Sequence, residues 1–142
     1  TAGYPEKHFE AMNLSTDMKH LKKKVDAGAE FIVTQLFYDN EKFFDFVKKC
    51  REIGIKVPII PGIKPITNLR HLSFIPKFFH VNFPESFSNE LEKCKTDEEI
   101  KRVGIEWTTA QCKELVKADI PVIHFYTMGR GTAVKNIAKE IF

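Results

Sequence analysis

The sequence lacks any apolar run approaching the ~20 residues that a membrane-spanning helix requires. It also has few cysteines: Cys50, Cys94 and Cys112 are odd in number, widely spaced and outside any C-x-x-C or Cys/His pattern. This spacing argues against both a disulfide framework and a metal site. We therefore expect reduced thiols in a cytoplasmic protein, with no bound metal and no membrane contact.

A large excess of charge of one sign is absent as well. The chain has 22 Lys and Arg residues against 19 Asp and Glu residues, for a net charge of +3. Such a balance requires no nucleic-acid partner, so a small-molecule ligand is the simpler expectation. With 142 residues, 43% of them hydrophobic and 13 of them Phe, the chain suffices for the core of one domain.

The first residues read as a loop. The chain starts at Thr1 rather than Met, shows no signal-peptide pattern, and carries Gly3 and Pro5. We expect this segment to be a loop that leaves a strand, and the whole chain to be a piece of a longer protein.

The segment Phe31–Asp39 (FIVTQLFYD) is nearly continuous in apolar residues and predicts a strand buried on both faces of a parallel sheet. Gln35 shares its side of this strand with Val33 and Phe37, close to the carboxyl end. A buried amide needs hydrogen-bond partners. Gln35 therefore either bonds a neighbouring loop backbone or faces a ligand, since α/β proteins bind ligands at the carboxyl ends of their strands.

The rest of the chain alternates between helical and strand patterns. Two further strands are expected over residues 57–60 and 122–126. Six helices are expected. The first five begin at the N-terminal signals Ser15–Asp17, Asp39–Asn40, Thr67–Asn68, Pro84–Glu85 and a capping box over Thr96–Glu99, and a final helix carries residues 133–141. The first ends near Ala27, the second before Gly54 and the fifth near Lys117, while the third is interrupted near Pro76. Gly104 should permit close packing of its helix. This alternation predicts an α/β fold with parallel strands.

A rigid loop, Pro61–Pro65, follows the strand over residues 57–60. Gly62 lies between two prolines, where it either makes a tight turn or lets another backbone or a ligand approach closely. Lys64 occupies a position suited to a Schiff-base lysine, which leaves a lysine-dependent aldolase-type barrel as an alternative function.

Cationic side chains gather on one flank of the helix expected over residues 15–27. Asp17, His20 and Lys24 fall at i, i+3 and i+7, with Lys23 beside them. These groups are either solvated or form a site for phosphate groups. Arg130 follows the last strand, where its guanidinium suits a carboxylate or phosphate ligand or else pairs with a loop acid.

Four segments resemble methylenetetrahydrofolate reductases: YPEKH at 4 to 8, DMKHLKKKVDAGAEFIVTQLFYD at 17 to 39, PIIPGIKP at 58 to 65 and HFYTMGR at 124 to 130. They include the K-x-D-A-G-A and T-Q-x-F-x-D signatures and cover essentially the whole chain. The resemblance implies the C-terminal part of a (β/α)8 TIM barrel, from the end of strand five through strand eight. Residues 1–142 would then be a single partial domain.

The resemblance also implies an activity in one-carbon metabolism and methionine biosynthesis. The family binds the flavin FAD and reduces methylenetetrahydrofolate to methyltetrahydrofolate with NADH or NADPH. Its general acid and the acid beside the flavin belong to earlier strands that this sequence does not contain. No catalytic residue is therefore expected here, and the isolated fragment should be inactive.

Residues that contact FAD follow from the same resemblance. It assigns Tyr4 and His8 to the flavin. It assigns a second group to the ribose and diphosphate: Asp17, His20, Lys23 and Lys24.

Substrate residues follow in the same way. Gln35 would hydrogen-bond the pterin, whose edge complements an amide, and Arg130 would hold the glutamate tail of the folate. The remaining implied contacts are His71, at the position of a family Gln, Ile75 with Phe74 beside it as an apolar packing face, and Tyr126 and Met128 at the border of the pocket. Met128 and Gly129 depart from the usual Y-T-L-N-R of the family's last loop.

A non-catalytic alternative also remains. A half-barrel exposes two open sheet edges, which invite pairing with another copy or with a missing half. We therefore expect a homo-oligomer or self-association of the fragment.

Overall fold

Strands and helices alternate along the chain as the apolar segments predict, and the computed structural model describes all of residues 1–142. The strands form one sheet in the order β1-β2-β3-β4, with every pairing parallel. Their bounds are β1 (Ala2–Gly3), β2 (Ile32–Leu36), β3 (Ile59–Ile63) and β4 (His124–Phe125). The prediction of an α/β fold with parallel strands is confirmed.

Helices connect each strand to the next. The first two crossovers contain one helix each, the third contains three, and one helix follows β4. Their bounds are α1 (Leu14–Asp26), α2 (Asn40–Glu52), α3 (Arg70–Phe79), α4 (Glu85–Glu92), α5 (Asp97–Lys117) and α6 (Thr132–Ile141). None of them combines the length and apolarity that crossing a membrane requires.

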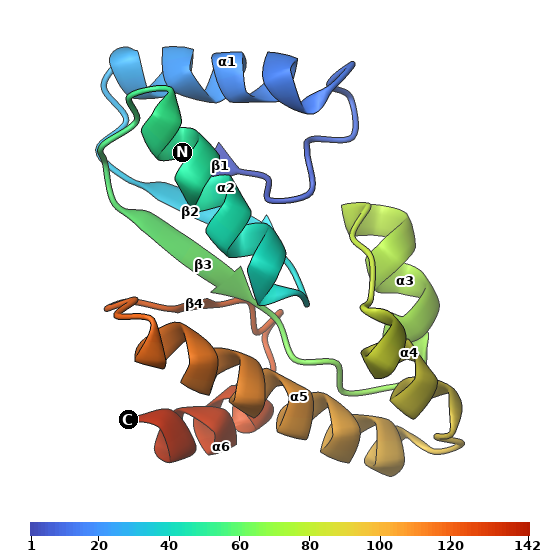
Figure 1. Cartoon of the computed structure of the whole chain (residues 1–142). Coiled ribbons are helices and arrows are strands. Elements are labelled where there is room, and N and C mark those ends of the chain that lie inside the picture. The colour runs from blue at the N-terminus through green and yellow to red at the C-terminus, as the bar shows by residue number, and fades with distance from the viewer.

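The main core lies between the sheet and helices α1, α2, α5 and α6. Its side chains come from β2 and β3 on one side and from these four helices on the other. A second core joins the end of β2 to α3, α4 and α5, and of these α3 and α4 lie beyond the carboxyl ends of the strands (Figure 1). Apolar residues at helical spacing supply both cores.

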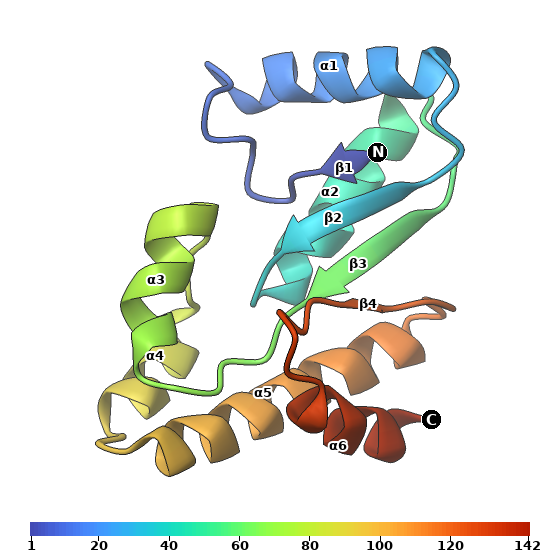
Figure 2. The same cartoon turned by 180° about the vertical axis from the view of Figure 1, so that it is seen from behind.

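The opposite face of the sheet carries no helix, as the view from behind shows (Figure 2). On β2, Ile32 and Leu36 are buried against the cores, whereas Val33 and Gln35 on the other face are half-buried. Phe31, just before the strand, is 48% exposed. The prediction that this strand is buried on both faces is therefore wrong, because helices cover the sheet on one side only.

The bounds of several helices and strands differ from the predictions. Asn13 caps α1, because its side chain accepts the Thr16 N–H, so the helix begins at residue 14, before the cap predicted at residues 15–17. Pro76 lies inside α3 without interrupting it. β4 is two residues long rather than five, since this edge strand pairs only with β3 and Val122 is half exposed.

Side chains of α5 fix the end of β2. Gln111 Nε2 donates to Phe37 O at 3.0 Å, and Trp107 Nε1 donates to Tyr38 O at 3.1 Å. Asn40 Nδ2 in turn donates to Gln111 O at 3.0 Å. These bonds satisfy main-chain groups that the sheet leaves unpaired, and they hold the β2–α2 loop in one position.

Gly104 allows α5 to approach the chain that follows β3. A Cβ atom at this position would lie 1.9 Å from Ile66 O, well inside van der Waals contact. The prediction of close packing at this glycine is confirmed.

We predict that Gly104→Ala destabilises the protein by about 1–3 kcal/mol, because the added methyl group overpacks the contact with Ile66. Helix propensity alone would give the opposite sign, since Ala is favoured over Gly by about 0.5–1 kcal/mol in a helix interior. Thermal unfolding of the two proteins measures the difference. Ala110→Gly, on the exposed side of the same helix, is the control and should cost only the propensity difference. A higher unfolding midpoint for Gly104→Ala would contradict the close contact.

Candidate functional site

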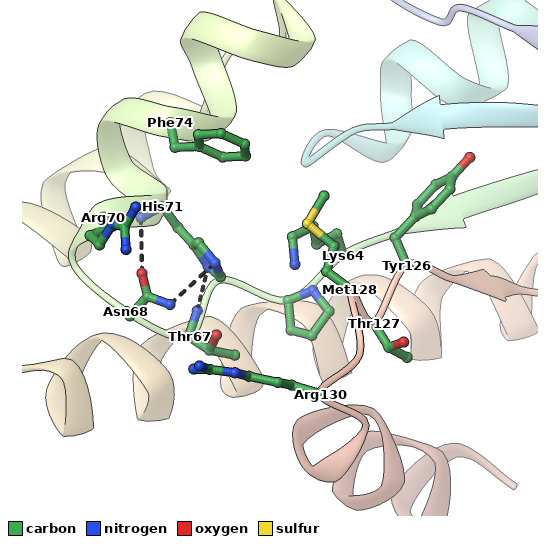
Figure 3. A pocket seen from close by; sticks show the side chains of 11 residues that line it. Lys64, Thr67, Asn68, Arg70, His71, Phe74, Tyr126, Thr127, Met128 and Arg130 are labelled. Atoms are coloured by element: carbon green, nitrogen blue, oxygen red, sulfur yellow. Dashed lines mark hydrogen bonds between the residues drawn. The ribbon is translucent and has the colours of Figure 1, made fainter.

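A cavity of about 230 Å³ lies at the carboxyl ends of β3 and β4, between the start of α3 and the β4–α6 loop (Figure 3). Parallel strands bring these loops to one edge of the sheet, which is where α/β proteins bind ligands. The lining residues are Lys64, Pro65, Thr67, Asn68, Arg70, His71, Phe74, Tyr126, Thr127, Met128 and Arg130.

The cavity is cationic. Lys64, Arg70 and Arg130 line it, and no Asp or Glu does. Arg130 forms no ion pair, so the alternative of a salt bridge to a loop acid is not what the structure shows. Asp97 lies nearby, but its Oδ1 accepts the Leu69 N–H at 2.8 Å. Positive charge without a matching acid favours an anionic ligand.

His71 is neutral at physiological pH. Burial, followed by the positive charge of Lys64, lowers its pKa from 6.5 to about 4, although Asp97 acts in the opposite direction. Its Nδ1 accepts the Thr67 N–H at 3.2 Å, and its Nε2 lies 3.2 Å from Asn68 Nδ2, so both ring nitrogens already have neighbours within the chain. His71 therefore lines the cavity without adding charge to it.

Lys64 is almost completely buried, with 4% of its surface exposed. It makes no ion pair within the chain, and burial lowers its pKa. Figure 3 shows its amine directed into the cavity, on the side of His71 and Met128. Because this amine opens into the cavity and pairs with no acid of the chain, it is suited to meet an anion.

Tyr126 reaches across β3 to β2. Its hydroxyl donates to Thr34 O at 2.9 Å, and its ring passes beside Gly62, where a Cβ atom would lie 2.7 Å from Tyr126 Cε2 and 2.2 Å from Thr34 O. Gly62 does not have a positive φ. Of the two roles considered for this glycine, close approach rather than a tight turn is the one observed.

Gln35 lies beside this contact, at an irregularity in the sheet. The register between β2 and β3 shifts by one residue between Val33 and Leu36. The Leu36 N–H donates to Gln35 Oε1 at 3.0 Å, while Gln35 Nε2 makes no hydrogen bond within the chain. Gln35 thus combines both expected roles: its oxygen bonds neighbouring main chain, and its half-buried amide nitrogen remains free for a ligand.

The structure brings four of the six implied substrate residues into the cavity: His71, Tyr126, Met128 and Arg130. Gln35 is outside the lining, one strand away. Ile75 is fully buried in the second core and does not reach the cavity, because the adjacent Phe74 faces it instead. At this position the apolar wall is therefore Phe74 and not Ile75.

Three of the implied cofactor residues form a cluster after β1. The His8 N–H donates to Asp17 Oδ2 at 2.8 Å, and the Tyr4 and His8 rings meet edge to face at 4.5 Å. Burial, and then Asp17, raises the pKa of Tyr4. Tyr4 also adds to the effect of burial in raising the pKa of Tyr126, so this cluster lies within electrostatic reach of the cavity.

The other cofactor residues lie further along α1. His20 and Lys23 line a second cavity, of about 600 Å³, between α1 and the last turn of α2, to which Lys49 also contributes. Lys24 is exposed and outside it. The predicted cationic flank of α1 is present, divided between this cavity and solvent.

Sequence reasoning missed Asn68 and Arg70 as lining residues. Asn68 was expected to cap a helix, and its Oδ1 does accept the His71 N–H at 3.2 Å. The sequence pointed to these two residues only through their position directly after the loop that follows β3. Which of their side chains face the cavity depends on where α3 begins.

Comparison with known proteins places the chain in one family. The sequence model described as methylenetetrahydrofolate reductase matches residues 1–141. The chain is 40% identical to a probable methylenetetrahydrofolate reductase (NADPH) of Caenorhabditis elegans, over 99% of this chain and 21% of the relative. It is 44% identical to methylenetetrahydrofolate reductase (NADH) 1 of Arabidopsis thaliana, over 89% of this chain and 23% of the relative.

A bacterial relative and a solved structure extend the comparison. The 5,10-methylenetetrahydrofolate reductase of Salmonella typhimurium is 37% identical, over 91% of this chain and 44% of the relative. The solved structure is an uncharacterized protein from Clostridium thermocellum that binds two copies of 5-methyl-5,6,7,8-tetrahydrofolic acid. It shares the fold with a TM-score of 0.61 at 21% identity, over 99% of this chain and 51% of that one. The chain thus spans less than half the length of these curated relatives, and it belongs to the methylenetetrahydrofolate reductase family.

Proposed function

We propose that this chain supplies the folate- and FAD-binding residues of an enzyme that reduces methylenetetrahydrofolate to methyltetrahydrofolate. The observation that carries the proposal is the cationic cavity in which His71, Tyr126 and Arg130 meet, at the same sheet edge as Gln35. A folate is an elongated ligand with a polar pterin at one end and carboxylates at the other. The two ends of this edge offer the matching groups.

The folate would lie across the ends of β2, β3 and β4. The free Gln35 amide nitrogen would donate to the pterin, and the unpaired Arg130 guanidinium would bind a carboxylate of the glutamate tail. Between them, Phe74 and Met128 would pack on the aromatic linker, while neutral His71 would form an uncharged part of the wall.

The residues after β1 and along α1 fit FAD. Asp17 keeps one carboxylate oxygen free to accept from a ribose hydroxyl, and Tyr4 with His8 offers an aromatic surface for a flavin. His20 and Lys23 provide cationic donors for a diphosphate. When bound, FAD would supply the redox chemistry, taking a hydride from NADH or NADPH and delivering it to the folate.

The sheet itself favours part of a larger barrel. All strands are parallel, the helices cover one face, and apolar residues such as Val33 and Ile60 are only half-buried on the other. In a (β/α)8 barrel the inward face of the strands is filled by side chains of the remaining strands. We propose that these four strands are strands five to eight of such a barrel. In isolation the chain would then self-associate through its open face and edges.

Removing the Gln35 amide should weaken folate use and leave FAD bound. Loss of a neutral hydrogen bond costs about 0.5–1.5 kcal/mol, so Gln35→Ala should raise the KM for methylenetetrahydrofolate by about 3- to 10-fold. Steady-state kinetics of the intact protein measure this, with the flavin-to-protein absorbance ratio as the control for FAD. Gln35→Glu keeps an oxygen for the Leu36 N–H but removes the donor, and it should raise the KM for methylenetetrahydrofolate by a similar factor. Unchanged folate kinetics in both variants would remove Gln35 from the site.

Reversing charge on α1 should release FAD. Each charge-assisted bond to a phosphate contributes about 1.5–3 kcal/mol, so Lys23→Glu combined with Lys24→Glu should lower FAD affinity by at least about tenfold. The flavin content of the purified protein checks this. Lys48→Glu combined with Lys56→Glu changes the net charge equally at exposed sites and should retain FAD. Full flavin content in the α1 variant would contradict the phosphate assignment.

Neutral His71 should be replaceable by Gln. The pKa of His71 in the folded protein, about 4, lies below the ordinary 6.5, so as the pH falls His71 is protonated in the unfolded chain before it is protonated in the folded one. The stability that the fold gains by keeping His71 neutral is fully present above pH 6.5 and is lost as the pH falls toward 4. His71→Gln should therefore keep the KM for folate at pH 7.5 and lose less thermal stability than the wild type between pH 6.5 and 4.5. An equal loss of stability in both proteins would show that His71 is not held neutral.

A further inference from the structure

We propose that Lys64 is a second anion-binding residue of the folate site, so that Lys64 and Arg130 bind the two different carboxylates of one glutamate tail. The inference rests on the proposed folate function and adds a specificity residue to it. Lys64 follows β3, and Arg130 lies in the loop after β4, so two neighbouring parallel strands deliver them to one cavity.

Burial without a partner is the first argument. The Lys64 side chain is 4% exposed, yet it takes part in none of the ion pairs or side-chain hydrogen bonds of the chain. Lysine residues are rarely buried to this extent unless their amine has a partner. Its amine is directed into the cavity (Figure 3), so a ligand can supply the missing partner.

The surroundings of Lys64 supply the second argument. The charged and titratable groups that line the cavity with it are His71 and Arg70 from α3, Tyr126 just after β4 and Arg130 from the β4–α6 loop, while Asp97 lies outside the lining. None of the lining groups is an acid, and His71 is held neutral. One buried and one exposed cation, neither of them in an ion pair, match a ligand that carries two negative charges better than one that carries a single charge.

The two cations differ in exposure. Lys64 is buried, with its amine near Met128 (Figure 3), whereas Arg130 is exposed. A ligand end that reaches both must present its two anionic groups at different depths. The α- and γ-carboxylates of a glutamate, separated by a short flexible chain, satisfy this requirement.

The test uses the FAD-loaded intact protein and calorimetric titration with methyltetrahydrofolate and its α- and γ-monoamides. In the wild type each monoamide should bind more weakly than the dicarboxylate, by about tenfold or more for a lost charge-assisted bond. In Lys64→Met the penalty for one monoamide should disappear, and in Arg130→Met the penalty for the other. Lys56→Met, at an exposed lysine just before β3, should retain both penalties.

Stability gives an independent readout. Met has nearly the volume of the Lys stem without its charge, so Lys64→Met should raise the unfolding midpoint of the folate-free protein and reduce the further stabilisation by methyltetrahydrofolate. A lowered midpoint would mean that Lys64 has a structural acid partner in the intact protein, which overturns the inference.

Other outcomes are equally decisive. Persistence of both amide penalties in Lys64→Met overturns the role of Lys64 but leaves the folate function intact if Arg130→Met and Gln35→Ala still weaken binding. A rise in the KM for NADPH but not for NADH would assign Lys64 to a phosphate instead. A borohydride-reducible adduct on Lys64 would make it a nucleophile. Absence of methyltetrahydrofolate binding to the wild type would reject the proposed function itself.

Discussion

The arrangement of the site depends on the absence of a side chain at Gly62. Because this residue has no Cβ, the Tyr126 ring can lie across β3 and its hydroxyl can reach Thr34 O on β2. Thr34 also bonds Gly62 directly, since its Oγ1 accepts the Gly62 N–H at 2.9 Å. Three strands are thereby locked together at their carboxyl ends. The β4–α6 loop with Arg130 and the β2 end with Gln35 are held in one fixed relation.

The register shift in β2 follows from the same crowded region. Two residues of β2, Thr34 and Gln35, stand opposite one residue of β3, which leaves the Leu36 N–H outside the regular ladder. The Gln35 side chain satisfies that N–H, so the amide has a structural task and a fixed position. A polar group held in this way by local main chain is preorganised, and a ligand that meets its free nitrogen need not order it.

Periodicity and end signals predicted most of the fold, because they are local. The Thr96 capping box, the Asp39 cap and the close approach at Gly104 are all in the structure. The exposed face of β2 could not be predicted, since a continuous apolar run is the same whether helices or other strands cover it. The sequence pattern also could not predict that Phe74 rather than Ile75 faces the cavity. The direction that each of two adjacent helix residues faces depends on where the helix starts.

Stability and binding make opposite demands on the cavity at the end of β3. Burial of Lys64 at the end of β3 lowers the pKa of its amine, because partial loss of water disfavours the charged form in the empty site. The same exclusion of water strengthens the attraction to any anion that enters. A site that is unfavourable when empty therefore discriminates strongly in favour of a charged ligand. The low pKa of His71 shows that the same electrostatic environment already acts on its neighbours.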